Sequence, residues 1–196
     1  VRHGALILRT SLQSRVVPRG IYYHPKFDYT FDNSVYTLKL GYPSSHQFAL
    51  DRVQAGSTVL DIGCGPGFMA RELSKRGVKS ISLDRYILGE TREFSYMTIE
   101  SDVESYAFDT NQEPVDTILI LDIIEHLKAP EAFLSKLRRR YAKDNPSVII
   151  TTANIGFFII RLSLLFGQFN YGKRGILDMD HTRLFTFGSL RRILQN

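Results

Sequence analysis

The chain has few of the residues that cross-link a fold or anchor it in a membrane. It holds one cysteine in 196 residues, so it forms no internal disulfide and no zinc site on cysteine alone, and a reducing compartment is expected. Its longest apolar run, residues 155–169, contains Arg161 and is shorter than the roughly 18 residues that span a bilayer. What remains is 43% hydrophobic and 23% charged, which suits the core of one globular domain and excludes collagen and low-complexity disorder.

Acidic residues are missing from residues 1–20, which carry four arginines. The formal net charge of the whole chain is +5, so the remaining residues are nearly neutral. A basic tail on a neutral domain is weak evidence for a nucleic-acid partner, and we expect none. We therefore interpret residues 1–20 as a basic tail or the remnant of an upstream region, and residues 21–196 as one domain.

From residue 57 onward, short β-branched runs alternate with amphipathic stretches, which is typical of βαβ units in a parallel sheet. The predicted strands are residues 57–62, 79–84, 96–101, 117–121 and 147–152. The predicted helices are residues 67–76, 130–143, 157–166 and 187–194, the last capped by Thr186. A further helix, capped by Ser44 or Ser45, is predicted ahead of the first strand.

The most informative segment follows the first predicted strand and reads Asp61-Ile62-Gly63-Cys64-Gly65-Pro66-Gly67. Alternating glycines at a strand-to-helix turn let a ligand approach bare backbone where a Cβ atom would collide. Phe68 stands where a dinucleotide fingerprint needs glycine or alanine, and no Gly-Lys-Ser/Thr follows, so pyrophosphate and triphosphate ligands are disfavoured. Asp61, in an apolar strand end, needs a partner, either a ligand amine or the amides of the loop.

Carboxylates end the next two strands as well. Asp84 closes the second strand, about 20 residues beyond the glycines, where an acid can accept both hydroxyls of a ribose. Asp102, followed by Val103, closes the third, where a carboxylate can accept from an exocyclic amine. Each acid alone is explained equally well as a helix cap. Together, in register with the glycine loop, they favour a nucleoside site.

With these residues the chain resembles the class I S-adenosylmethionine-dependent methyltransferases, from about residue 48 to its C-terminus. The family's acid-x-Gly-x-Gly-x-Gly motif is matched in full by Asp61, Gly63, Gly65 and Gly67. The resemblance implies S-adenosylmethionine as cofactor and S-adenosylhomocysteine as product, with the loop around the methionine part. It also implies that Asp84 holds the ribose and that Asp102 and Val103 frame the adenine.

The fold that the resemblance implies is an α/β Rossmann-like open parallel sheet in the strand order 3-2-1-4-5, flanked by helices. Within it, residues 22–56 would form an N-terminal lid and helix, residues 57–154 the cofactor-binding core, and residues 155–196 the acceptor-side helices and loop. The antiparallel strands that follow the last helix in this family are not found before Asn196, so we expect a fragment of a longer chain.

Two histidines are candidates for a base on the acceptor side. Asp122 follows the fourth strand and is expected to line the amino-acid end of the cofactor, and His126 shortly after it is a base, an orienting group or a residue that packs beneath the cofactor. Residues 170–186 resemble those of a bacterial subgroup associated with glycosyltransferases and cell-surface polysaccharide biosynthesis. There His181 is the first candidate for the base and Arg183 for a clamp on a hydroxyl or an anion.

The alternatives for these two residues are structural. His181 would then brace its loop, and Arg183 would pair with Asp178 or Asp180. Residues 155–169 also have two explanations. They form a helix over the acceptor pocket or against a second copy in a homodimer, or an interfacial helix that makes peripheral contact with the inner face of the membrane.

We therefore predict a cytoplasmic O-methyltransferase that acts on a sugar, a glycan or another small hydroxylated acceptor, without a metal. The alternative is a catalytically silent domain that binds the cofactor and serves as a scaffold in a larger polysaccharide-biosynthesis protein. RNA methylation is a third hypothesis, and it predicts an affinity that falls steeply with salt.

Overall fold

The computed structural model describes residues 40–108, 114–172 and 175–195. The described residues belong to two compact units. The core unit holds residues 40–154 and 182–195, apart from the gap, and the other unit holds residues 155–181.

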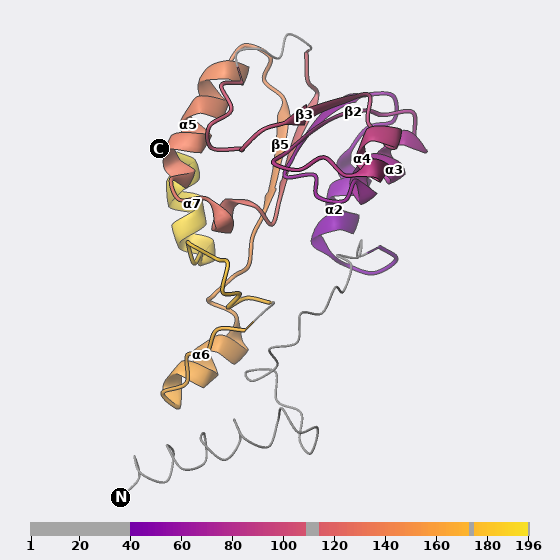
Figure 1. Cartoon of the computed structure of the whole chain (residues 1–196). Coiled ribbons are helices and arrows are strands. Elements are labelled where there is room, and N and C mark those ends of the chain that lie inside the picture. Colours follow the sequence, from indigo (N-terminus) through magenta and orange to yellow (C-terminus); the bar gives the residue numbers. More distant parts are fainter. Residues whose placement is uncertain (1–39, 109–113, 173–174, 196) are drawn as a thin grey trace, which may run out of the picture. The chain divides into compact units, whose positions relative to one another are not determined.

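The core unit is built on a five-stranded parallel sheet (Figure 1). Its strands are β1 (Thr58–Ile62), β2 (Lys79–Asp84), β3 (Met97–Glu100), β4 (Thr117–Leu121) and β5 (Ser147–Thr151). Their order is β3-β2-β1-β4-β5, which confirms the predicted Rossmann-like sheet. The order reverses between β1 and β4, where Ile62 lies opposite Ile120. In open α/β sheets, ligands bind beyond the carboxyl ends of the strands at that reversal.

Helices cover both faces of the sheet because successive side chains of each strand point to opposite faces. On one face, Leu60 and Ile62 pack in a cluster with Phe133 and Leu137 of α5 (Pro130–Tyr141), against which α7 (Phe187–Gln195) also packs. On the other face, the buried cluster is formed by β1, β4 and β5 with α2 (Ser45–Arg52) and α3 (Phe68–Ser74). Figure 1 shows α5 and α7 on one side of the sheet and α2, α3 and α4 (Gly89–Phe94) on the other. This double burial fixes the strand ends that carry the site.

Short-range side-chain bonds set the helix boundaries. Ser44 Oγ accepts a hydrogen bond from the Gln47 N–H at 3.1 Å and caps α2. Thr186 and Ser189 cap α7 reciprocally, since each backbone N–H donates to the hydroxyl of the other residue at 2.9 and 3.1 Å. Helix α4 (Gly89–Phe94) is not predicted by the sequence pattern, because only Thr91 of its six residues is buried.

The 155–181 unit contains α6 (Phe158–Leu165) and an isolated parallel bridge between Gly172 and Asp178. No residue of α6 is buried. In the described part of the chain, no helix has both the length and the apolar character needed to span a bilayer.

Candidate active site

Three glycines with positive φ shape the loop between β1 and α3, with φ of 75° at Gly63, 53° at Gly65 and 86° at Gly67. A Cβ on Gly63 would lie 2.2 Å from the Cδ1 atom of Ile123, and one on Gly67 would lie 2.6 Å from the backbone of Thr91. Neighbouring protein atoms therefore require these two glycines. A Cβ on Gly65 would meet no atom within 4 Å. Only Gly65 presents bare backbone to open space.

Both polar groups of Gly65 are held by other elements. Its N–H donates to Asp84 Oδ2 at 2.8 Å, and its carbonyl oxygen accepts from Thr91 Oγ1 at 3.1 Å. The Gly63 N–H donates to the Leu83 carbonyl oxygen at 2.7 Å. The loop is thus anchored to β2 and α4. The sequence reading missed Thr91, since its only signal is a small polar residue in an unpatterned segment.

A pocket of about 310 Å³ lies at the carboxyl ends of β1, β2 and β4. It is lined by six predicted site residues, Asp61, Gly63, Gly65, Asp84, Asp122 and His126, and also by His46, Cys64, Pro66, Phe68, Met69, Leu121 and Ile123. His46 was missed by the sequence reading. It lies in the first turn of α2 and is buried, and its only signal is that this helix precedes β1.

The Asp61 carboxylate is the least satisfied group in the pocket. Its side chain is 2% exposed, and its Oδ2 atom is buried without a hydrogen-bond partner among the described residues. Burial, and secondly the charge of Asp84, raise the pKa of Asp61 to about 7. A cationic ligand such as an ammonium group would satisfy this oxygen. Burial also raises the pKa of the Cys64 thiol, followed by the charges of Asp61 and Asp84, which disfavours a thiolate nucleophile.

Asp122 sits directly after β4 in a conformation that is unusual for a residue with a side chain, with a φ of 54°. Its Oδ1 accepts from Thr151 Oγ1 at 2.8 Å, and its Oδ2 accepts from Ser45 Oγ at 3.4 Å. Such left-handed backbone costs about 1–3 kcal/mol and persists where the surroundings enforce it, commonly at ligand sites. Asp122 therefore joins the ends of β4 and β5 to the start of α2 at the pocket wall.

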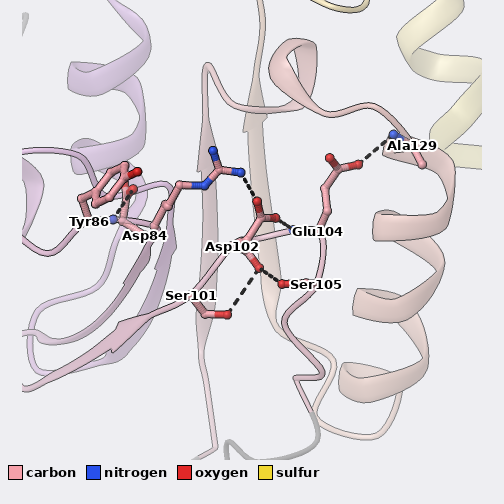
Figure 2. A network of polar contacts seen from close by, with 8 residues as sticks. Asp84, Tyr86, Ser101, Asp102, Glu104, Ser105 and Ala129 are labelled. Carbon is pink, nitrogen blue, oxygen red and sulfur yellow. Dashed lines mark hydrogen bonds and ion pairs between the residues drawn. The ribbon is translucent and has the colours of Figure 1, made fainter.

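Asp102 lies in a different environment and does not line the pocket. One carboxylate oxygen forms an ion pair with Arg85, and the other accepts from the Glu104 N–H at 2.8 Å. The hydrogen bond from Arg85 holds the pKa of Asp102 below its usual value. Figure 2 shows the turn, in which Glu104 in turn accepts from the Ala129 N–H at 2.8 Å. Val103 is partly buried and packs against the core.

The predicted acceptor-side residues fall in both units. His126 ends the 3-10 helix Ile124–His126 and lines the pocket. Arg183 of the core unit pairs with Glu131 of α5 at 3.2 Å. His181 belongs to the 155–181 unit. Its Nδ1 lies 3.1 Å from the Ile176 carbonyl oxygen, which assigns that nitrogen as a donor. The catalytic roles of His126, His181 and Arg183 stay predictions.

No group of three or more His, Cys, Asp or Glu side chains is arranged to bind a metal ion within the described ranges. The pocket residues do fit an adenosyl amino acid. Asp61 offers an unpaired buried carboxylate oxygen, Gly65 leaves open space, and Asp84 closes the adjacent strand with a second carboxylate. The fold and this site define a nucleoside-binding α/β domain.

Comparison with known proteins narrows that class. Residues 37–196 match a family described as a methyltransferase domain. The chain therefore belongs to the class I S-adenosylmethionine-dependent methyltransferases. Magnesium protoporphyrin IX methyltransferase from Synechocystis, a crystal structure with bound S-adenosylhomocysteine, has the same fold, with a TM-score of 0.53 and 20% identity. The alignment covers 77% of this chain and 72% of that one.

Curated relatives include a probable (S)-tetrahydroprotoberberine N-methyltransferase 2 from Papaver bracteatum, 28% identical over 128 residues, and a ubiquinone biosynthesis O-methyltransferase from Rickettsia bellii, 28% identical over 143 residues. The matches cover 59% and 70% of this chain. They cover 35% of the Papaver protein and 59% of the Rickettsia protein, so the chain spans less than two thirds of either relative.

Proposed function

We propose that this domain binds S-adenosylmethionine in the pocket beyond β1, β2 and β4 and transfers its methyl group to a small acceptor. The observation that carries the proposal is the buried Oδ2 of Asp61, which has no partner among the described residues, in a pocket that Gly65 also lines with open space where its Cβ would be. An oxygen in that state destabilises the fold unless a ligand donor satisfies it. Membership of the methyltransferase family supplies the ligand class.

The pocket residues divide the work of holding the cofactor. Asp61 would accept from the ammonium of the amino-acid end, Gly65 would lie against it, and Asp84 would accept from the ribose hydroxyls. The cofactor supplies a methyl group already activated by a sulfonium. The chain then has two tasks, to hold the acceptor in line and to keep water away. We assign both tasks to residues beyond β4 and β5.

We favour an oxygen acceptor on a small hydroxylated molecule. The ubiquinone biosynthesis O-methyltransferase of Rickettsia supports this, and the Papaver N-methyltransferase keeps an amine acceptor as the competing outcome. A hydroxyl must lose its proton during transfer, so a base is useful. His126, in the pocket lining, and His181 are the candidates. A sugar acceptor in polysaccharide biosynthesis is the narrower form of the proposal, and it rests on residues 170–186.

Calorimetry with S-adenosylmethionine and S-adenosylhomocysteine, followed by transfer of a labelled methyl group, tests the proposal. The acceptor panel should hold catechols, phenols, monosaccharides and secondary amines. Cofactor binding with turnover of a hydroxylated compound is expected. Binding without turnover across the panel would favour the silent scaffold domain. RNA methylation predicts an RNA affinity that falls steeply with salt, and a flat salt response would remove it.

The exposed side chains of the 155–181 unit favour a second copy as a partner. Phe158, Leu165 and Phe166 are 65%, 79% and 72% exposed, and apolar residues occupy nearly every face of α6. A surface amphipathic helix would keep a polar face. We expect a dimer in light scattering and no flotation with anionic vesicles. Flotation of a monomer would instead support contact with a membrane.

A further inference from the structure

Glu125, the residue before His126, carries a buried carboxylate that does not line the cofactor pocket. Glu125 is 2% exposed. Its Oε1 accepts from the Ala153 N–H at 3.1 Å, and its Oε2 is buried without a partner in the described part of the chain. Burying a carboxylate for a single backbone hydrogen bond is unfavourable. A role in function explains why the residue is not apolar.

The backbone of Glu125 holds a second segment. Its carbonyl oxygen accepts from the N–H groups of Thr182 and Arg183 at 2.9 and 3.0 Å. The Thr182 hydroxyl lies 3.2 Å from the same oxygen and donates to the Leu127 carbonyl oxygen at 2.7 Å. Residues 182–183 are thus fixed to the segment that carries His126.

The contacts of Glu125 with Ala153 and with residues 182–183 lie where the chain enters and leaves the 155–181 unit. The chain leaves the core unit after residue 154 and returns at residue 182. Ala153 lies next to the exit, and Thr182 is the first residue of the return. Glu125 therefore holds both stems of the 155–181 unit, one with its side chain and one with its carbonyl oxygen. Asp61 and Asp84, by contrast, share no hydrogen bond with Glu125.

We propose that Glu125 is a positioning residue for methyl transfer, which fixes the two stems beside His126 and so orders the acceptor side of the site. The inference rests on the proposed function, because it takes the segments beyond β4 and β5 as the acceptor side. Since its contacts are separate from those of the cofactor carboxylates, its loss should affect transfer and leave cofactor affinity intact.

The test compares Glu125→Ala with Glu125→Gln. The amide keeps an acceptor for the Ala153 N–H, whereas alanine removes it. In Glu125→Ala we expect amide exchange at Ala153, which loses its acceptor, to accelerate at least about tenfold. Exchange at residues 182–183, which donate to the retained carbonyl oxygen of residue 125, and in α3 should change little. The Kd of S-adenosylhomocysteine should stay within about threefold, while kcat for a panel acceptor falls at least about tenfold. Glu125→Gln should stay within about threefold of the wild type in all three measurements.

Two further variants keep the test decisive if Glu125→Ala does not fold. Thr182→Val removes the hydroxyl that donates to the Leu127 carbonyl oxygen and should lower kcat about threefold without changing cofactor affinity. Glu93→Gln, an exposed acid on α4, is the matched control and should change nothing.

Unchanged exchange at Ala153 in Glu125→Ala would overturn the proposal, as would a parallel loss of cofactor affinity and turnover, or a Glu125→Gln variant as impaired as Glu125→Ala. Failure of the wild type to bind S-adenosylhomocysteine would refute the proposed function instead, and the exchange comparison would still decide whether the Glu125 side chain holds the stem at Ala153.

Discussion

The end of β1 and the turn after β3 both present an aspartate at the carboxyl edge of the sheet, in opposite states. Asp61 is buried, one of its oxygens has no partner in the part of the chain that the structure describes, and its pKa is raised to about 7. Asp102 is partly exposed, both of its oxygens are engaged by Arg85 and Glu104, and its pKa is lowered. The same residue type is thus poised for a ligand at one strand end and satisfied by the protein at another.

The difference shows where the binding energy for a cofactor should come from. A group that the protein leaves unsatisfied gains the most when a ligand arrives, because no existing hydrogen bond has to be broken. A group that is already paired and partly exposed gains little. We therefore expect cofactor affinity to depend strongly on the β1 loop and weakly on the Arg85–Asp102 pair.

The largest effect is expected from Gly65→Val. The valine side chain would occupy the open space that Gly65 leaves, so binding of S-adenosylhomocysteine should fall more than about 100-fold in calorimetry. Gly56→Val is the matched control, because Gly56 also has a positive φ, of 73°, with no atom near its missing Cβ, and lies outside the pocket. Both variants carry a similar backbone strain of about 1–2 kcal/mol. Equal loss of binding in both would mean that strain, and not occlusion, is responsible.

Asp84→Ala should have the next largest effect. The variant loses a charged acceptor for the ribose and the bond that anchors the Gly65 N–H, which should weaken S-adenosylhomocysteine binding by about 1.5–3 kcal/mol, or about 10–150-fold. Glu100→Ala tests specificity, because Glu100 lies opposite Asp84 on β3 and pairs with Arg92 at the surface. Unchanged affinity in Asp84→Ala would mean that the ribose is held elsewhere.

Asp61 should make cofactor affinity depend on pH. Its folded pKa of about 7 lies above the ordinary 3.8, so the carboxyl is mostly protonated at pH 6 and mostly ionised at pH 8. Only the ionised form pairs with an ammonium, so affinity should rise about tenfold between these pH values, with release of a proton. Calorimetry in two buffers of different ionisation enthalpy measures the affinity and the number of protons released. Asp61→Asn should flatten the profile, and a flat profile in the wild type would contradict the assignment.

The raised pKa of Asp61 also makes the free energy of unfolding depend on pH. A folded pKa above the unfolded one means that the folded state binds more protons between about pH 4 and pH 7, so the contribution to the free energy of unfolding falls as pH rises through this range. Asp61→Asn removes the buried charge and should unfold at a higher denaturant concentration than the wild type at pH 8. A lower midpoint would show that the ionised carboxylate is stabilised by a partner inside the protein.

Much of the sheet was predictable because its signals are local. The β-branched runs and the spacing of Asp61, Asp84 and Asp102 identify strands and their carboxyl ends from short stretches of sequence. The resemblance at the glycine loop implied the strand order, which the structure confirms. Asp61, Gly65 and Asp84 line the same pocket because β2, β1 and β4 are neighbours in that order.

The rest depends on contacts between residues far apart in the chain. Sequence alone does not show that Gly63 is required by Ile123 and Gly67 by Thr91, so all three glycines look alike although only Gly65 faces open space. His46 reaches the pocket through packing of α2 that no local pattern encodes. The resemblance to a polysaccharide-associated subgroup, carried by residues 170–186, also remains a prediction.

The smallest effect is expected from Arg85→Ala, which tests the other side of the comparison. Arg85 and Asp102 have side chains that are 63% and 35% exposed, and exposed ion pairs contribute little because water and salt screen them. Removing Arg85 should let the pKa of Asp102 rise toward its ordinary value, restrained by the remaining hydrogen bond from the Glu104 N–H. A carboxyl NMR titration follows this directly. The affinity for S-adenosylhomocysteine should change no more than about threefold in calorimetry. A tenfold loss of affinity would mean that Arg85 itself contacts the nucleoside. A tenfold gain of affinity would mean that Arg85 competes with the adenine for Asp102. In either case the turn after β3 would belong to the binding site as fully as the loop after β1.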